Sequence, residues 1–457
     1  MQVVFYLNRE RRARREQQPP DVTVLEYLRA SGMTGSKEGC ASGDCGACTA
    51  VVCALDSGGK PAFRAFNSCI ALMPSVHGKW LITIEGLKNN NRLHPAQEAM
   101  VKTHGSQCGF CTPGFVMSLF AFGKSGADNP SYEDATTAVS GNLCRCTGYR
   151  PIIRAAMTMA KNDDDGYAIK TAKQKLGELQ KAAPPDTLSL TAAQIADNVL
   201  RRPLIVAGGT DLALTITQQL QSIPQPAVID NAPELATIRE QKNGWHIGAA
   251  ANWESVQKTL GKKLPSLDEL IHRFGSPQIR YQGTVGGNIA NASPVADGPP
   301  PFIALGAHLI LRRGKQKRQM PLESFFISYK KTALRRGEWI ESVFVPKPAA
   351  DGVFRVYKIS KRFDDDISAL LLALYLRRKN DKITSAVVVA GGMAETPRRA
   401  FCTERALCGK EWSMQTFAEA GDALAKDFSP VNDARASKQY RMRAAANLLL
   451  RFANETT

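Results

Sequence analysis

The first part of the chain has the short apolar runs that are typical of strands. Such runs lie at residues 3–7, 50–52 and 81–84. Residues 23–30 instead carry apolar side chains at helical spacing and predict one short helix. Residues 1–85 are therefore expected to form a small mixed sheet with one helix.

The pattern becomes helical from residue 86 to residue 162. Pro95 stands where a helix is expected to begin, since proline suits the first helical turn. Further helices are predicted at 115–122, 132–139 and 152–160. Residues 163–185 are polar, charged and aperiodic, which indicates a linker with one exposed helix.

The remainder of the chain has a different texture, in which apolar strands run into glycines. Two such segments are residues 204–211 and residues 283–288. Beyond Pro346, strands are predicted at 354–359 and 385–390, and a long helix at 440–452. The longest apolar run, at 369–376, is far shorter than the roughly 20 residues that span a membrane.

The charge of the chain raises the question of nucleic-acid binding. The 457 residues carry a formal net charge of +17. Basic clusters lie at 9–15, 312–318 and 335–336, but no zinc-finger, helix-turn-helix or RNA-recognition pattern accompanies them. We interpret them as solvated faces, contacts with an acidic partner, or steering of an anionic cofactor. We expect a cytoplasmic protein that binds neither nucleic acid nor a membrane, since no secretory signal is evident.

Eight of the 11 cysteines form two tetrads. The first is Cys40, Cys45, Cys48 and Cys69, and the second is Cys108, Cys111, Cys144 and Cys146. The Cys-x4-Cys-x2-Cys spacing of the first is the plant-type ferredoxin pattern for a 2Fe-2S cluster. In its loop, Gly43 and Gly46 permit positive φ and let backbone amides face the cluster.

The cysteines have two alternative interpretations. A disulfide framework is disfavoured by the low cysteine content and the lack of a secretory signal. Structural zinc is the stronger rival, although paired Cys-x2-Cys knuckles would be its usual pattern. Cys53 lies in an apolar strand, and Cys402 and Cys408 have no partner arrangement, so all three are expected to be structural.

The two glycine segments predict a nucleotide cofactor. A strand that runs into Gly-Gly-Thr can lay backbone amides against a pyrophosphate, with hydroxyl donors from Thr210 or Thr284. Asn288 could donate to phosphate or ring atoms. Neither segment is G-x-G-x-x-G, so the Rossmann fingerprint is absent.

Together these motifs resemble a known family. The ordered set is Glu-Gly-Cys at 38–40, Gln-Cys-Gly-Phe-Cys-Thr-Pro-Gly at 107–114, Gly-Asn-Leu-Cys-Arg-Cys-Thr-Gly-Tyr at 141–149, Ala-Gly-Gly-Thr-Asp at 207–211 and Thr-Val-Gly-Gly-Asn at 284–288. It resembles the small, iron–sulfur and FAD subunit of bacterial xanthine dehydrogenases, in the molybdenum hydroxylase family.

The resemblance implies an α+β multidomain fold. It has a β-grasp, ferredoxin-like 2Fe-2S domain, a four-helix-bundle 2Fe-2S domain, and a vanillyl-alcohol-oxidase-like FAD domain of the PCMH type with a small α+β C-terminal domain. The boundaries we predict are 1–85, 86–162, a linker at 163–185, 186–347 and 348–457.

It also implies the residues that contact FAD. These are Ile205, Val206, Ala207, Gly208, Gly209, Thr210, Asp211, Leu212, Phe274, Thr284, Val285, Gly286, Gly287, Asn288, Asp297, Ile340 and Lys358. Asp365 matches an acid beside the flavin, and the resemblance gives it and Lys358 catalytic roles. Asp211 stands where some relatives carry glutamate, and Phe363 interrupts a charged stretch.

The implied function is electron transfer. A partner large subunit with the molybdenum cofactor would oxidise hypoxanthine or xanthine, and two 2Fe-2S clusters and FAD would carry the electrons to NAD+. A heterotetramer of two small and two large chains is expected. The alternatives are the same subunit of an aldehyde, CO or aromatic hydroxylase, a stand-alone iron–sulfur flavoprotein reductase, and a zinc-stabilised binding module.

Overall fold

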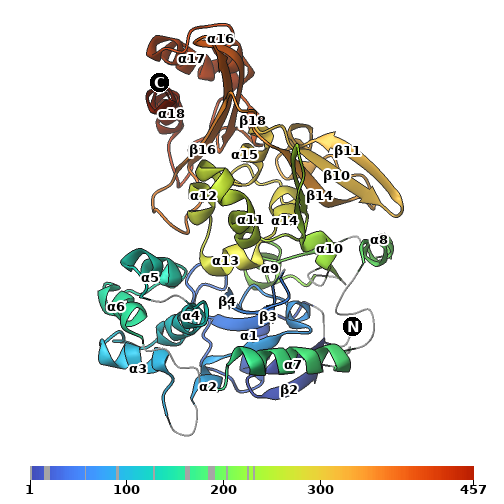
Figure 1. Ribbon diagram of the computed structural model, residues 1–457, viewed down its shortest axis with the longest axis vertical. Helices are drawn as coiled ribbons and strands as arrows, with labels where there is room; N and C mark the ends of the chain where they lie inside the picture. The colour runs from blue at the N-terminus through green and yellow to red at the C-terminus, as the bar shows by residue number, and fades with distance from the viewer. Residues whose placement is uncertain are drawn as a thin grey trace. The chain divides into compact units, whose positions relative to one another are not determined.

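In a computed structural model, the chain forms two compact units. The structure describes residues 3–14, 21–56, 58–88, 92–126, 129–159, 165–183, 191–201, 204–223, 226–229 and 232–456. The first unit comprises Met1–Pro233 and Ser276–Gly283, and the second comprises Glu234–Gly275 and Thr284–Thr457 (Figure 1). Arg15 and the ends of the predicted 163–185 linker lie outside the described residues.

A five-stranded sheet with one helix begins the first unit. Its strand order is β2-β1-β5-β3-β4, with β1 (Val3–Leu7) and β5 (Trp80–Ile82) parallel. The other strands are β2 (Glu10–Arg14), β3 (Thr49–Leu55) and β4 (Pro61–Asn67). This is the predicted ferredoxin-like sheet. The strand expected at 81–84 is shorter, because it ends at Ile82 and Ile84 begins helix α2 (Ile84–Leu87).

Both faces of β1 are covered, which explains why its five residues are all buried. Val3, Phe5 and Leu7 pack with helix α1 (Val24–Ala30), whereas Val4 and Tyr6 belong to the core of the helical part. A strand covered on both faces reads as a continuous apolar run rather than as an alternating one.

The predicted helical part packs around one apolar helix. That helix is α4 (Thr112–Lys124), in which eight consecutive residues from Gly114 to Ala121 are buried. Helix α3 (Pro95–Lys102) begins at the proline, as predicted, and α5 (Tyr132–Val139) and α6 (Arg150–Thr158) complete the group.

One prediction for the following segment was wrong. Helix α7 (Ile169–Ala182) is not simply exposed, because Ala172, Leu176 and Leu179 are buried in the same core as α4 and β1. The apolar stripe is narrow, and four lysines and one glutamate surround it in the sequence, so the segment does not have an evident amphipathic pattern.

The rest of the first unit contains short elements. Helix α8 (Ala192–Arg201) is followed by the parallel pair β6 (Ile205–Val206) and β7 (Ala227–Val228), and α9 (Ala213–Thr217) lies between them in sequence. Helix α13 (Pro277–Gln282) also belongs to this unit and packs against β4.

The second unit begins with a five-stranded sheet packed against helices. The sheet order is β11-β10-β14-β9-β8. Its strands are β8 (Ile238–Glu240), β9 (Gly244–Gly248), β10 (His308–Arg313), β11 (Gln316–Pro321) and β14 (Trp339–Pro346). The helices in this part of the unit are α10 (Pro233–Ala236), α11 (Trp253–Leu260), α12 (Pro265–His272), α14 (Val285–Ala290) and α15 (Pro299–Ala304). The small pair β12 (Phe326–Ser328) and β13 (Lys331–Thr332) follows.

The C-terminal part of the second unit is a second sheet that packs against three helices. The sheet contains β15 (Gly352–Ile359), β16 (Leu370–Lys379), β17 (Lys382–Gly391) and β18 (Arg398–Arg399) in that order. The longest apolar run in the sequence forms the inner strand β16. Helices α16 (Phe401–Leu407), α17 (Met414–Asp427) and α18 (Lys438–Thr456) bury Leu407, Phe417 and Phe452 against this sheet. The described helices include none that is both long and apolar enough to cross a membrane.

Candidate functional site

The first cysteine tetrad lies on the loop between α1 and β3 and at the end of β4. Cys48 and Cys69 are each 2% exposed, whereas Cys40 and Cys45 are half-buried. Gly43 and Gly46 have φ of +85° and +67°, as the sequence predicted. The backbone N–H groups of Ser42 and Cys45 donate to Cys40 Sγ at 3.4 and 3.3 Å. The loop therefore directs amides at sulfur.

The thiols of this tetrad stand in pairs. A hydrogen bond with Cys45 lowers the pKa of Cys40 to about 4 and raises that of Cys45. Cys69 likewise lowers the pKa of Cys48, while its own is raised. In each pair the hydrogen bond therefore favours the thiolate form at one cysteine over the other.

The second tetrad lies near helix ends. Cys111 is the N-cap residue of α4, and Cys144 and Cys146 lie in the loop before α6. The N–H groups of Cys146 and Thr147 donate to Cys144 Sγ at 3.4 and 3.5 Å. A hydrogen bond with Cys108 raises the pKa of Cys146, while burial and then Cys144 raise that of Cys111 to about 12.

The paired arrangement bears on which metal group the tetrads would hold. Across the described residues, no three His, Cys, Asp or Glu side chains converge as they would around one ion. The pairs are Cys40 with Cys45, Cys48 with Cys69, Cys108 with Cys146, and Cys111 with Cys144. A tetrahedral zinc ion needs four ligands at one point, whereas a 2Fe-2S cluster divides four thiolates between two irons. The donor sets therefore fit two 2Fe-2S clusters.

The first glycine segment has the features of an anion-binding loop. It follows β6, and Gly209 has φ +71°. Among the described residues, the backbone N–H groups of residues 207–210 and of Leu212 donate to no protein acceptor. Consecutive unpaired amides in such a turn form a concavity that suits phosphate oxygens. This loop therefore fits the pyrophosphate of a dinucleotide.

The second glycine segment does not have the predicted form. Thr284 is the N-cap residue of helix α14, and Gly286, Gly287 and Asn288 lie inside that helix rather than at a strand end. The amides of Val285, Gly286, Gly287 and Asn288 all donate to protein oxygens. A cofactor would therefore be bound here by side chains and not by backbone amides. Asn288 Oδ1 is buried and has no hydrogen-bond partner among the described residues.

Two of the predicted FAD contacts form a buried ion pair in the second unit. Lys358 Nζ bonds to Asp297 Oδ2, and Ser368 Oγ donates to Asp297 Oδ1 at 2.6 Å. Lys358 is 5% exposed and Asp297 is 6% exposed. The carboxylate therefore offsets the charge of Lys358, to which the resemblance gives a catalytic role.

The remaining predicted residues of the second unit are placed as follows. Ile340 is buried in β14, and Phe274 is half-buried with its ring 4.9 Å from that of Trp253. Asp365 is half-buried at φ +49°, and its carbonyl accepts from Arg362 at 3.0 Å.

Arg273 holds the loop that carries Asp365. Its guanidinium donates to the carbonyls of Lys358 and Phe363 at 3.0 and 3.3 Å, and it lies 4.8 Å from the Phe363 ring centroid. The phenylalanine that interrupts the charged stretch is thus a partner of this arginine. Sequence reasoning missed Arg273, for which only its position beside Phe274 was a signal.

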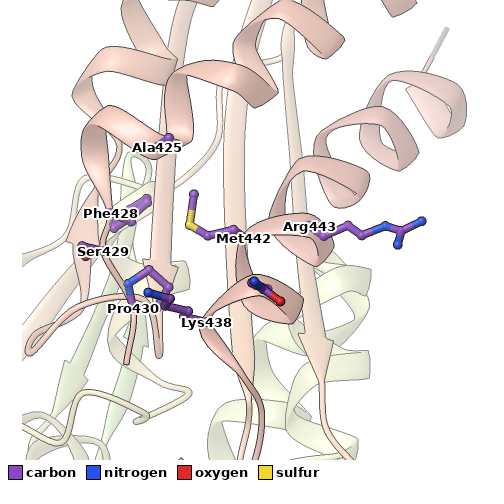
Figure 2. Close-up of a pocket in the computed structure, with 8 residues that line it drawn as sticks. Ala425, Phe428, Ser429, Pro430, Lys438, Met442 and Arg443 are labelled. Carbon is purple, nitrogen blue, oxygen red and sulfur yellow. The ribbon is translucent and has the colours of Figure 1, made fainter. Parts of the chain in front are cut away.

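A cavity of about 460 Å³ lies elsewhere, near the ends of α17 and α18 (Figure 2). Phe428, Pro430 and Met442 line it together with Lys438 and Arg443. None of the predicted site residues is among its lining residues.

Four known families match successive parts of the chain. They are described as 2Fe-2S iron-sulfur cluster binding domain (residues 7–73), 2Fe-2S binding domain (83–157), FAD binding domain in molybdopterin dehydrogenase (183–348) and CO dehydrogenase flavoprotein C-terminal domain (355–456). The chain belongs to the molybdenum hydroxylase family. It is the iron–sulfur and flavin part of such an enzyme, with two 2Fe-2S clusters and FAD as its cofactors.

Curated relatives match nearly all of this molybdenum hydroxylase chain. Xanthine dehydrogenase 2 of Arabidopsis thaliana is 31% identical over 94% of the chain and 38% of its own length. Xanthine dehydrogenase of Emericella nidulans is 32% identical over 90% of the chain and 35% of its own length. The chain thus spans little more than a third of the curated relatives that it matches.

Solved structures match a smaller part. Reconstituted CO dehydrogenase from Oligotropha carboxidovorans is 25% identical with a TM-score of 0.54, over 57% of this chain and 93% of that one. Quinoline 2-oxidoreductase from Pseudomonas putida 86 is 22% identical with a TM-score of 0.52, over 58% of this chain and 93% of that one, and shows the fold alone.

Proposed function

We propose that the chain is the electron-transfer part of a xanthine dehydrogenase. It would receive electrons from purine oxidation at a molybdenum centre that lies outside these 457 residues and deliver them to NAD+. The observation that carries this proposal is the match of relatives named xanthine dehydrogenase along 94% of the chain, through both cluster parts and the flavin part.

The residues divide into three proposed roles. The two tetrads would ligate the clusters, which supply one-electron transfer. FAD, when bound, links one-electron transfer to two-electron chemistry, and the amides of residues 207–210 and Leu212 would hold its pyrophosphate. Asn288, Phe274, Ile340 and the Asp297–Lys358 pair would contact the rest of the cofactor. Arg273 would position the loop with Asp365.

A large molybdenum subunit is the proposed partner, in a heterotetramer of two small and two large chains. Support comes from the surface beside the second tetrad, where Cys108, Cys146 and Gln107 are exposed. These exposed ligands are the ones that can lie next to an electron donor on another chain.

A second candidate is the same part of a CO or aromatic hydroxylase. The similarity to CO dehydrogenase, in a solved structure and in the C-terminal family, favours the CO reaction. However, the CO dehydrogenase chain of Oligotropha carboxidovorans is covered over 93% of its length by only 57% of this chain. The continuous match of xanthine dehydrogenases to clusters and flavin domain therefore favours the purine reaction.

The test uses the chain purified with its natural partner. Addition of xanthine and NAD+ is expected to produce NADH, followed by absorbance. If NADH forms with CO or an aromatic heterocycle but not with xanthine, the second candidate is correct. The variant Cys144→Ser should abolish purine-dependent NADH formation but retain NADH oxidation by an artificial acceptor, because only the path to the flavin is interrupted.

A further inference from the structure

A buried asparagine joins the two cysteine loops. Asn142 lies two residues before Cys144 and is 2% exposed. Its Nδ2 donates to the carbonyl of Gly46 at 3.0 Å and to Thr49 Oγ1 at 3.1 Å. Gly46 lies between Cys45 and Cys48, so one amide of the second loop is fixed to the backbone of the first.

A backbone hydrogen bond runs beside this contact. The N–H of Leu143 donates to the carbonyl of Cys45 at 2.9 Å. Because Leu143 precedes Cys144, this one bond connects a cysteine of the first tetrad with the residue next to a cysteine of the second. The rest of the path from Cys45 to Cys144 follows covalent bonds of the backbone.

The asparagine is itself held from two sides. Its Oδ1 accepts from Ser118 Oγ at 2.6 Å, and Ser118 belongs to α4. The same oxygen accepts from Gln278 Nε2 at 3.3 Å, and Gln278, which is fully buried, belongs to α13. The side-chain amide of Asn142 thus has four hydrogen-bond partners, and all of them are protein groups: the Gly46 carbonyl, Thr49 Oγ1, Ser118 Oγ and Gln278 Nε2.

Close packing leaves this contact little freedom. A Cβ on Gly46 would lie 2.1 Å from the Gly141 carbonyl and 2.5 Å from Asn142 Nδ2. A Cβ on Gly141 would lie 2.1 Å from Gln278 Oε1. The backbone of the first loop thus approaches that of the second, and the Gln278 side chain of α13 approaches Gly141, as closely as glycine permits.

We propose that Asn142 is a positioning residue for electron transfer between the two iron–sulfur centres. By holding the Gly46 carbonyl, it fixes the Leu143–Cys45 hydrogen bond and with it the separation of the two tetrads. The transfer moves one electron from one centre to the other, and no bond forms or breaks and no proton moves. The inference rests on the proposed function, because both tetrads must hold clusters.

The experiment compares Asn142→Ala with Ser118→Ala in the complete enzyme. The first variant removes the bridge to Gly46, whereas the second removes one support of Asn142 and leaves the bridge. Four quantities are measured: iron and sulfide per chain, hydrogen exchange of the Leu143 amide, the spin–spin splitting between the reduced clusters in electron paramagnetic resonance, and Tm. If Asn142→Ala yields only apoprotein, Asn142→Ser is measured in its place.

The expected result is specific to the bridge. Asn142→Ala should retain both clusters, lose protection at Leu143 and lose the splitting, while Ser118→Ala retains both. A lowered Tm with unchanged splitting would mean that Asn142 is merely structural and would overturn the inference. Wild-type protein with zinc in place of iron would instead overturn the proposed function, so the two failures are distinguishable.

Discussion

At the scale of single residues, His77 couples stability to pH. Its Nδ1 accepts from the Val4 N–H at 2.9 Å, and the residue is 1% exposed. Burial, and secondarily the Lys79 charge, lower the pKa of His77 from 6.5 to about 4. Between these values the unfolded chain binds the proton and the folded chain does not, so stability increases with pH.

We therefore expect acidification to weaken the ferredoxin-like sheet before any carboxylate titrates. From pH 6.5 to about pH 5, His77 should lower the free energy of unfolding by about 1.5 kcal/mol. His77→Asn places an oxygen where Nδ1 lies and cannot be protonated there. Denaturant melts across this range should slope for wild-type protein and flatten for the variant, and equal slopes would refute the assignment.

The buried pair of Lys358 and Asp297 predicts a large cost for removing one partner only. Lys358→Met leaves Asp297 buried with the Ser368 hydroxyl as its remaining partner among the described residues, so unfolding should become easier by about 3 kcal/mol. Adding Asp297→Asn should recover much of this loss. The matched control is Lys258→Met, which breaks an exposed pair with Glu254 and should change the free energy by less than about 0.5 kcal/mol. Equal effects of the two lysine substitutions would contradict the prediction.

At the scale of elements, the loop after β6 contains two adjacent glycines that are needed for different reasons. Gly208 is closely packed, whereas Gly209 has a positive φ. A Cβ on Gly208 would lie 1.6 Å from the Gln282 carbonyl, which is backbone and cannot yield without moving α13. Gly209 has positive φ, but its nearest neighbours are 3.6 Å away, so alanine there costs only about 1 kcal/mol.

We expect Gly208→Ala to purify with most of its FAD lost, because the unpaired amides of the loop are displaced. Gly209→Ala should retain more of the flavin, and Gly177→Ala, which meets no neighbour in α7, should retain all of it. Flavin absorbance per chain measures the result. Loss of flavin in Gly209→Ala but not in Gly208→Ala would show that φ, and not close packing, governs this loop.

The sequence predicted an element correctly where the pattern has one structural meaning, and incorrectly where it has two. Helix α3 begins at Pro95 because proline has a defined place in the first turn, and β15 and β17 follow from apolar β-branched runs. The Thr-Val-Gly-Gly-Asn segment was misread, since a threonine before an apolar residue serves equally as an N-cap. The positive φ of Gly43 and Gly46 was predicted because the loop chemistry demands it.

The site was predictable where a motif carries it and not where packing does. Cysteine spacing predicts the tetrads, but nothing in the sequence marks Gln278, which lies far from Asn142 along the chain. Arg273 and His77 likewise owe their roles to the residues that folding brings beside them. Asn142 stands inside a recognised motif, yet only its contacts explain why an amide is needed there.

At the scale of the whole molecule, the compact units do not follow the order of the chain, because the first unit includes a segment from later in the sequence. Residues 276–283 lie in sequence between α12 and α14, yet they belong with the cysteine loops in the first unit. The Asn67 N–H donates to Gln282 Oε1 at 2.9 Å, which is a polar contact between this segment and the ferredoxin-like sheet. The cluster part is thus completed by a segment that comes from the flavin part of the sequence.

This organisation predicts that the tetrads fill independently. Cys111 caps α4, whereas Cys48 and Cys69 are buried beside α1, so each set of ligands has its own structural support. Cys111→Ser should lower the iron content from about four to about two per chain and retain the ferredoxin-type resonance signal. Cys408→Ser, at an exposed cysteine outside both tetrads, should leave iron and flavin unchanged. Loss of all four irons in Cys111→Ser would mean instead that the two loops assemble as one cooperative body, with Asn142 as the contact that couples their folding.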